Sequence, residues 1–275
     1  MEKLVFADAW QDFFSRHRME TFSHFFDEAQ GTCVNTNKKR NVLKLTIEDT
    51  PVRTFFLKRF YLGQVKDTIG AVWRFGRPMS QAAIEWTNAC HLQRHGIRTG
   101  NPVCFGEQMV MGFERRSFLL TEQIEGICLM DFLVERWRKL PRATQEQIVV
   151  EMAKLARRLH DVNVSLPDLY IWHIFIRHDP ATGGYALSVI DLHRMIPKAR
   201  TASERFKSLA RLHWSMSSRY FDDDLKDLLI SAYAEAGPTD GNCLLRSIRR
   251  NALTLARRGR DVGRYYPKTN LPSSR

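Results

Sequence analysis

Two short segments decide the fold: Asp168-Leu169-Tyr170-Ile171-Trp172-His173 and Val189-Ile190-Asp191-Leu192-His193-Arg194. Each segment places one carboxylate among nonpolar residues, which costs free energy unless the carboxylate is paired or has a chemical role. The two aspartates lie 23 residues apart, and the sequence between them predicts a strand, a polar turn with glycine and a second strand. Asp168 and Asp191 are therefore the first candidates for reactive groups.

The composition is typical of a globular protein that forms one large domain or two lobes. The 275 residues are 44% hydrophobic and 26% charged. No apolar run reaches the roughly 18 residues that a membrane-spanning helix needs, and the N-terminus lacks the hydrophobic stretch of a signal peptide. Five scattered cysteines without CxxC spacing argue against a disulfide framework or a zinc site. We expect a cytoplasmic location.

The positive charge is concentrated near the C-terminus. The formal net charge is +12, and residues 246–275 contain nine basic residues and one acidic residue. Such a segment favours an anionic partner such as phospholipid headgroups, a phosphorylated glycan or nucleic acid. It is equally explained by a solvated amphipathic helix with a frayed tail. Nucleic acid is the least favoured partner, because no zinc-finger, helix-turn-helix or RNP-like pattern is present.

The order of predicted elements indicates an α+β protein. Alternating residues predict strands over 43–47 and 54–60, joined as a hairpin. Ser80 and Gly96 are typical of the start and the end of a helix. The remaining predicted elements are strands over 102–105 and 117–121, a connector over 122–126, and helices over 142–160 and 242–258. We expect a β-rich N-lobe over 1–122, a mainly helical C-lobe over 123–262, a ligand cleft between them, and a basic tail over 263–275 that is possibly disordered.

The chain resembles the lipopolysaccharide core (Kdo/heptose) kinase family, which has the protein-kinase-like two-lobed fold. The two aspartate segments carry most of the resemblance, because the family has a similar Asp-x-Tyr-x-x-His loop and Asp-Leu-His-Arg run. Other matching segments are Phe55-Phe56-Leu57-Lys58-Arg59-Phe60, the Glu85-Trp86 helix, Phe118-Leu119-Leu120-Thr121-Glu122 and Leu209-Ala210-Arg211-Leu212-His213-Trp214-Ser215. The similarity extends over roughly residues 40–235.

The resemblance assigns a role to a lysine and a glutamate of the N-lobe. Lys58 is a lone cation on an apolar strand, and in kinases such a lysine holds the ATP phosphates and pairs with a helix glutamate, here Glu85. Alternatively, Lys58 is an edge-strand lysine that reaches to water, and Glu85 lies on a solvated helix face. The kinase interpretation is favoured because Lys58 and Glu85 precede Asp168 and Asp191 in the order that kinases have.

The resemblance also assigns the two aspartates and one histidine of the C-lobe. Asp168 is the expected base for an acceptor hydroxyl, and Asp191 is the expected Mg²⁺ ligand. Alternatively, Asp168 lies in a turn at the end of a helix, and Asp191 caps the start of the next segment. His173 lies where protein kinases have a metal-binding Asn, so we include it in the metal and nucleotide site. Since Mg²⁺ prefers oxygen, its imidazole is expected to orient a phosphate, a water or Asp191. His193 is expected to be structural.

Three further nucleotide contacts are assigned to Gly31, Glu122 and Ile124, although a glycine-rich phosphate loop in its usual form is missing. One departure from the family concerns the residues before Asp168. The family often has His-Arg there, whereas this chain has Leu166-Pro167. We therefore expect no cation beside the catalytic loop that could receive a regulatory phosphate.

The resemblance implies ATP- and Mg²⁺-dependent phosphorylation of a sugar hydroxyl on an inner-core glycolipid. The expected location is cytoplasmic, and the finer expectation is a peripheral position at the inner face of the inner membrane, with the basic C-terminus on anionic lipid. Two alternatives stay open at this point. One is a catalytically silent kinase-like binding module, and the other is a kinase for another small-molecule or protein acceptor.

Overall fold

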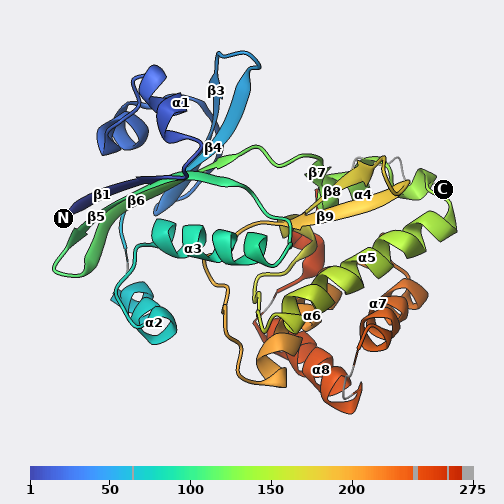
Figure 1. Cartoon of the computed structure of the whole chain (residues 1–275). Helices are drawn as coiled ribbons and strands as arrows, with labels where there is room; N and C mark the ends of the chain where they lie inside the picture. The colour runs from blue at the N-terminus through green and yellow to red at the C-terminus, as the bar shows by residue number, and fades with distance from the viewer. Residues whose placement is uncertain (64, 238–240, 259, 268–275) are drawn as a thin grey trace. The chain divides into compact units, whose positions relative to one another are not determined.

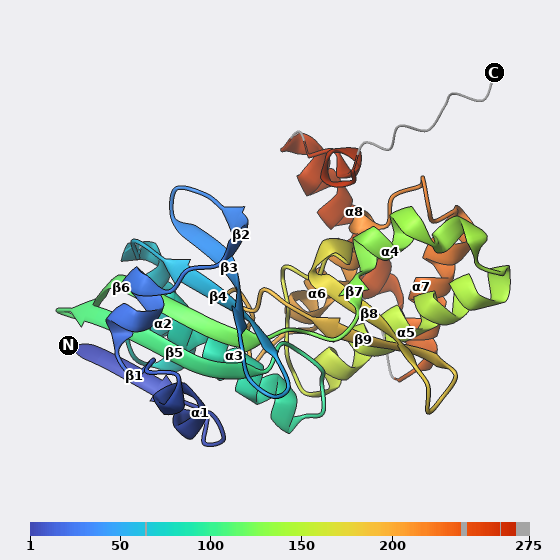
Figure 2. The ribbon, with the colours of Figure 1, turned by 90° about the horizontal axis from the view of Figure 1, so that it is seen from above.

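The computed structural model describes residues 1–63, 65–237, 241–258 and 260–267. The chain divides into two compact units, Met1–Ile124 and Glu125–Arg275. The division falls within the connector that the sequence predicts between the β-rich and the helical parts. Each unit is described by itself below (Figures 1 and 2).

The N-terminal unit is built on an antiparallel sheet, which has six strands over the described residues, in the order β1-β5-β6-β4-β3-β2. The strands are β1 Glu2–Phe6, β2 Thr32–Thr36, β3 Arg40–Ile47, β4 Arg53–Phe60, β5 Pro102–Val110 and β6 Phe113–Glu122. The predicted hairpin is confirmed as β3–β4, and both later strand predictions match parts of β5 and β6. Strand β1, which pairs with β5, was not predicted from the sequence.

Helices cover both faces of this sheet, α1 (Gln11–Arg16) on one face and α3 (Gln81–Arg94) on the other (Figure 1). Because strand side chains alternate between faces, β4 contributes to two cores. Phe55 and Leu57 join the phenylalanine-rich core beside α1, whereas Phe60 joins the core beneath α3. Lys58, with the same parity as Phe60, therefore points to the α3 face.

The helix α3 begins and ends where the sequence predicted. The Ser80 side chain accepts a hydrogen bond from the Ala83 backbone N–H, the usual action of an N-cap. At the other end Gly96 takes φ +67°, a left-handed conformation that glycine adopts at low cost and that stops the helix. A second helix of this unit, α2 (Val65–Phe75), was not predicted.

The C-terminal unit is mainly helical and carries a small sheet in the order β7-β8-β9. Its strands are β7 Ile127–Cys128, β8 Ile174–Asp179 and β9 Gly184–Val189. Its helices are α4 Leu129–Glu135, α5 Arg142–Asp161, α6 Ala202–Ser215, α7 Asp223–Glu235 and α8 Gly241–Arg257. The predicted apolar stripe of α5 is buried, and so are Leu244, Ile248 and Leu255 of α8, while the arginine-rich side of α8 is exposed.

The start of the predicted tail is packed rather than disordered. Tyr266 is buried, its hydroxyl donates to the Ser215 carbonyl at 2.7 Å, and its ring stacks on Tyr220. Tyr265 stacks on Trp172 with ring centroids 4.6 Å apart. Aromatic burial therefore fixes residues 262–267, and the rest of the predicted tail, 268–275, lies outside the described residues.

Candidate active site

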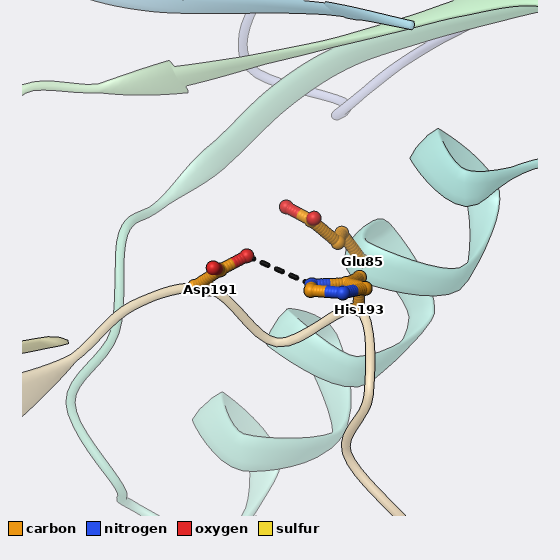
Figure 3. A group of neighbouring side chains, drawn as sticks. All are labelled: Glu85, Asp191 and His193. Atoms are coloured by element: carbon orange, nitrogen blue, oxygen red, sulfur yellow. Dashed lines mark hydrogen bonds and ion pairs between the residues drawn. The ribbon is translucent and has the colours of Figure 1, made fainter. Parts of the chain in front are cut away.

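The N-terminal unit contributes an ion pair between β4 and α3. The Lys58 Nζ lies 2.6 Å from Glu85 Oε1, and the two side chains are 15% and 7% exposed. Figure 3 shows Glu85 extending from α3. The pairing predicted from the sequence is therefore present, and the alternative of two solvated side chains is wrong. A buried pair of this kind is destabilised strongly by removing one partner, so each residue holds the other in place.

The three further nucleotide candidates lie at the same end of the strands, Gly31 on β2 and the other two at the end of β6. Glu122 is the last residue of β6, where its carboxylate contacts Asn101 and Arg53, and Ile124 follows in the connector. Gly31 precedes β2, at the end of that strand away from the β2–β3 turn. A Cβ there would collide with the Lys44 carbonyl, so close packing against β3 explains this glycine.

The C-terminal unit brings the two aspartate loops together through one hairpin. Strand β8 starts just after the Asp168 loop, and strand β9 ends just before Asp191. In an antiparallel hairpin the start of the first strand is beside the end of the second, and Ile174 pairs with Val189 here. A further backbone hydrogen bond, from Ile190 N–H to the His173 carbonyl at 3.0 Å, extends this pairing into the loops.

Asp168 is almost fully buried and is paired with two arginines. Its Oδ1 lies 3.0 Å from Arg194 Nη1 and 3.4 Å from Arg211 Nη1. The expectation that no cation lies beside the catalytic loop was therefore wrong. The charge that is missing at Leu166-Pro167 comes from a later loop and from α6, which are far along the chain but adjacent in the fold. These two guanidinium groups compensate a carboxylate that would be costly to bury alone.

Helix α6 holds the Asp168 loop through three polar side chains on one face. Ser208 Oγ accepts from the Leu166 N–H at 2.8 Å, and Ser215 Oγ accepts from the Ile171 N–H at 3.0 Å. Between them, Arg211 also donates to the Pro167 carbonyl. Residues three and seven positions apart lie on one helix face, so the loop is fixed at both ends and in the middle. The spacing of these polar residues was visible in the sequence but was not used.

His173 lies between the two aspartates. Its Nδ1 is 2.8 Å from the Asp168 carbonyl oxygen, so this nitrogen carries the proton and donates. Its Nε2 is 3.7 Å from Asp191 Oδ2. The backbone contact therefore sets the tautomer and directs Nε2 towards Asp191. Of the orientations predicted for this imidazole, the one towards Asp191 is found.

Asp191 has a strained backbone and a partner that the sequence reasoning missed. Its φ of +61° is uncommon for a residue other than glycine and is typical of functional sites. His193 Nδ1 lies 2.8 Å from Asp191 Oδ1, a contact drawn in Figure 3. His193 thus contacts the candidate metal carboxylate, which the expectation of a structural histidine did not include. The signal was its place two residues after Asp191, which lets an i, i+2 contact form in a loop.

Aromatic residues pack within and beside the Asp168 loop. Tyr170 stacks on Trp172 with ring centroids 4.7 Å apart, and both rings contact Trp214 edge-on. Burial raises the pKa of the Tyr170 hydroxyl above its ordinary value. The stacked rings limit the conformations that the catalytic loop can adopt.

An antiparallel sheet unit with a strand lysine paired to a helix glutamate, and a helical unit with two aspartate loops at one hairpin, define a protein-kinase-like fold. The sequence matches the Lipopolysaccharide kinase (Kdo/WaaP) family over residues 25–233, so the chain belongs to this family. The fold class expected from the sequence is confirmed. A solved structure described as WaaP in complex with acyl carrier protein has this fold at a TM-score of 0.68, with 22% identity over 96% of this chain and 100% of that one.

Two curated relatives are lipopolysaccharide core heptose(I) kinases named WaaP. The one from Escherichia coli (strain K12) is 28% identical over 169 residues, which are 59% of this chain and 63% of the relative. The one from Pseudomonas aeruginosa is 29% identical over 143 residues, 50% of this chain and 53% of the relative. The chain therefore spans less than two thirds of the length of these relatives. In the part of the chain that the structure describes, the helices are too short or too polar to cross a bilayer.

Proposed function

We propose that this protein is an ATP-dependent kinase that transfers the γ-phosphoryl group to a sugar hydroxyl of a lipopolysaccharide inner-core glycolipid. The observation that carries the proposal is the junction at His173, whose Nδ1 donates to the backbone carbonyl of Asp168 while its Nε2 faces the Asp191 carboxylate. One imidazole thus joins the Asp168 loop to the carboxylate of the Asp191 loop. Family membership and the kinase names of the relatives support the same reaction.

In this proposal the N-terminal unit binds the nucleotide. Lys58 is the cation for the α- and β-phosphates, and Glu85 fixes its ammonium group through the 2.6 Å contact. The end of β6 and the connector, with Glu122 and Ile124, would meet the base of ATP. The glycine Gly31 is the weakest of these assignments, because packing against Lys44 already accounts for it.

Asp191 is the residue that would hold a divalent cation, which we take to be Mg²⁺. The donor chemistry fits, since Mg²⁺ takes carboxylate oxygens and Asp191 offers a carboxylate that two imidazoles orient. When bound, the ion would neutralise charge on the phosphate oxygens. His173 and His193 suit the role of orienting Asp191 better than direct ligation, because imidazole is a poor ligand for this ion.

Asp168 is proposed to accept the proton of the acceptor hydroxyl. Both of its arginine contacts fall on Oδ1, so Oδ2 is the oxygen that would meet the hydroxyl. The contribution of Asp168 is chiefly to orient the attacking oxygen. The hydrogen bonds that α6 makes with the Asp168 loop serve the same purpose, because they hold the carboxylate in position.

The acceptor and the location are proposed from the relatives. A core heptose or a similar sugar of a lipid-linked glycan is the expected acceptor, at the cytoplasmic face of the inner membrane. The exposed arginines of α8 could meet anionic headgroups there. Which hydroxyl of the acceptor is phosphorylated depends on the pocket that binds the sugar and not on the phosphate chemistry.

The test is ATP consumption by the purified protein with inner-core glycolipid that lacks the phosphate. We expect turnover by the wild type and a loss of about 10²–10⁴-fold in Asp168→Asn, with Mg·ATP binding retained. Asp179→Asn is the matched control, because Asp179 ends β8 at the far end of the same hairpin. It should turn over like the wild type.

Failure of the wild type to be stabilised by Mg·ATP would refute the proposal. Stabilisation by ATP without turnover on any glycolipid or other sugar acceptor would instead favour the catalytically silent module. Turnover that Asp168→Asn leaves unchanged would remove Asp168 from the reaction.

A further inference from the structure

The helix α2 presents nonpolar side chains to solvent. Ile69, Val72 and Trp73 lie three and four positions apart, which places them on one side of the helix, and all three are exposed. Trp73 is 86% exposed, although Trp is a residue that folding normally buries in large part. The inner side, with Ala71 fully buried, supplies the packing that holds α2 to its unit.

The turn between β5 and β6 adds a second group of exposed nonpolar residues. Val110, Met111 and Phe113 are all exposed, and Met111 is 92% exposed. A Cβ at Gly112 would lie 3.6 Å from Pro78, so this turn is next to the chain that leaves α2. We call these six residues, Ile69, Val72, Trp73, Val110, Met111 and Phe113, the apolar patch.

Folding does not account for Met111. Met111 and Gly112 both have positive φ, +51° and +81°, as in the two-residue hairpin turn that favours Asn-Gly. A long nonpolar side chain at the first position costs backbone strain and is not repaid by burial. A local rule broken in this way is expected where the residue serves function.

The charges around the apolar patch are positive. Arg77 and Arg115 are exposed, and Arg74 is half-buried at the end of α2. Among the described side chains of 68–78 and 110–115 the one carboxylate is that of Glu114, which is buried and bonded to Ser117 and Gln81. Within these two stretches the described surface is therefore nonpolar and cationic, and the exposed acid beside them, Glu2 of β1, is bonded to Gln108.

We propose that the apolar patch docks on the surface of a lipid bilayer with anionic headgroups. Nonpolar side chains that project from a helix and a turn, with Trp among them and arginines beside them, are what an interfacial segment needs. Trp73 and Met111 project almost fully, so they fit a fluid nonpolar phase better than a rigid protein partner, which would have to offer a matching hole for each. The inference goes beyond the proposed kinase reaction and does not depend on it.

The experiment is flotation of the full chain with vesicles, either of phosphatidylcholine alone or with phosphatidylglycerol added, and without any glycolipid acceptor. We expect binding to the anionic vesicles and weaker binding to the neutral ones. The double variant Trp73→Ser/Met111→Asn should bind the anionic vesicles at least about tenfold more weakly. Both substitutions are at exposed positions, and Asn suits the left-handed turn, so the fold is kept.

Two controls separate this surface from others. Val52→Ser removes an exposed nonpolar side chain from the β3–β4 turn and should bind like the wild type. Leu253→Ser does the same on α8 and tests whether the C-terminal helix is responsible instead. As a second readout, brominated lipid should quench the fluorescence of the wild type more than that of Trp73→Phe, which keeps a nonpolar ring.

Several outcomes would overturn the proposal. They are no vesicle binding by the wild type, undiminished binding by Trp73→Ser/Met111→Asn, or loss of binding in Leu253→Ser alone. If the double variant bound vesicles like the wild type but lost binding to an acidic protein, the apolar patch would be assigned to a protein partner. The double variant should still phosphorylate a delipidated core oligosaccharide. A loss of membrane binding can therefore be distinguished from a loss of the proposed kinase activity.

Discussion

Replacing Lys58 and Glu85 by Met, singly and together, tests whether their ion pair is a buried, coupled unit. At an N–O distance of 2.6 Å the attraction amounts to about 6 kcal/mol at an effective dielectric constant near 20. Desolvation of both charges offsets most of this attraction, but a single substitution leaves the other charge buried without its partner. We expect each single variant to lose about 3 kcal/mol of unfolding free energy.

The double variant separates the pair from the individual residues. Once Lys58 is gone, removing Glu85 no longer breaks this ion pair, so the double variant should cost at least about 2 kcal/mol less than the sum of the two single variants. The measurement is urea unfolding of all four proteins, compared by midpoint at a common slope. All three variants should also fail to turn over ATP. In each of them the proposed phosphate contact of Lys58 is either removed or no longer held in place by Glu85.

A second ion pair provides a matched control. Arg142 and Asp222 have the same 2.6 Å N–O distance but lie on the surface. Water screens such a pair, so its cycle should give a much smaller coupling. If the Lys58–Glu85 coupling is no larger than that of Arg142–Asp222, the reasoning from burial is refuted.

Three further predictions concern the C-terminal unit. Asp191→Ala should lose the stabilisation by Mg·ATP that we expect of the wild type, about 2.7 kcal/mol at a hundredfold excess over Kd, and retained stabilisation would argue against the metal role. Arg211→Leu should lower kcat by about 10²-fold with ATP binding intact, because the catalytic loop loses its central anchor, and an unchanged kcat in steady-state kinetics would contradict this. Burial, and secondarily the charges of Arg205 and Arg157, lower the pKa of His160 to about 3 from its ordinary 6.5. The unfolded chain therefore binds the extra proton between pH 6.5 and 3, so the unfolding free energy should fall by about 1.4 kcal/mol per pH unit through this range, and this part of the slope should vanish in His160→Gln. The measurement is denaturant unfolding of the wild type and of His160→Gln at pH 7.5 and 5.5. If the unfolding free energy changes equally in both proteins between these pH values, the prediction is contradicted.

Local patterns in the sequence predicted the elements that depend on neighbours along the chain. The period-two pattern gave the β3–β4 hairpin, and Ser80 and Gly96 gave both ends of α3, because capping needs only residues within one turn. Strand β1 was missed because its partner β5 lies about a hundred residues away and no short-range signal reports that pairing. Helix α2 was missed although Ile69, Val72 and Trp73 recur at helical spacing on one side, and that side is exposed in the structure.

The residue types of the candidate site could be named before the fold was known, but not all of their partners. The sequence by itself determined that Lys58, Glu85, Asp168 and Asp191 occur in kinase order, since a charged residue within a nonpolar run is visible without coordinates. Only the tertiary structure decided that Arg194 and Arg211 neutralise Asp168, and that His193 joins Asp191. The physical reason is that a buried charge can be compensated from any element that packs beside it, and packing between distant segments leaves no spacing rule in the chain.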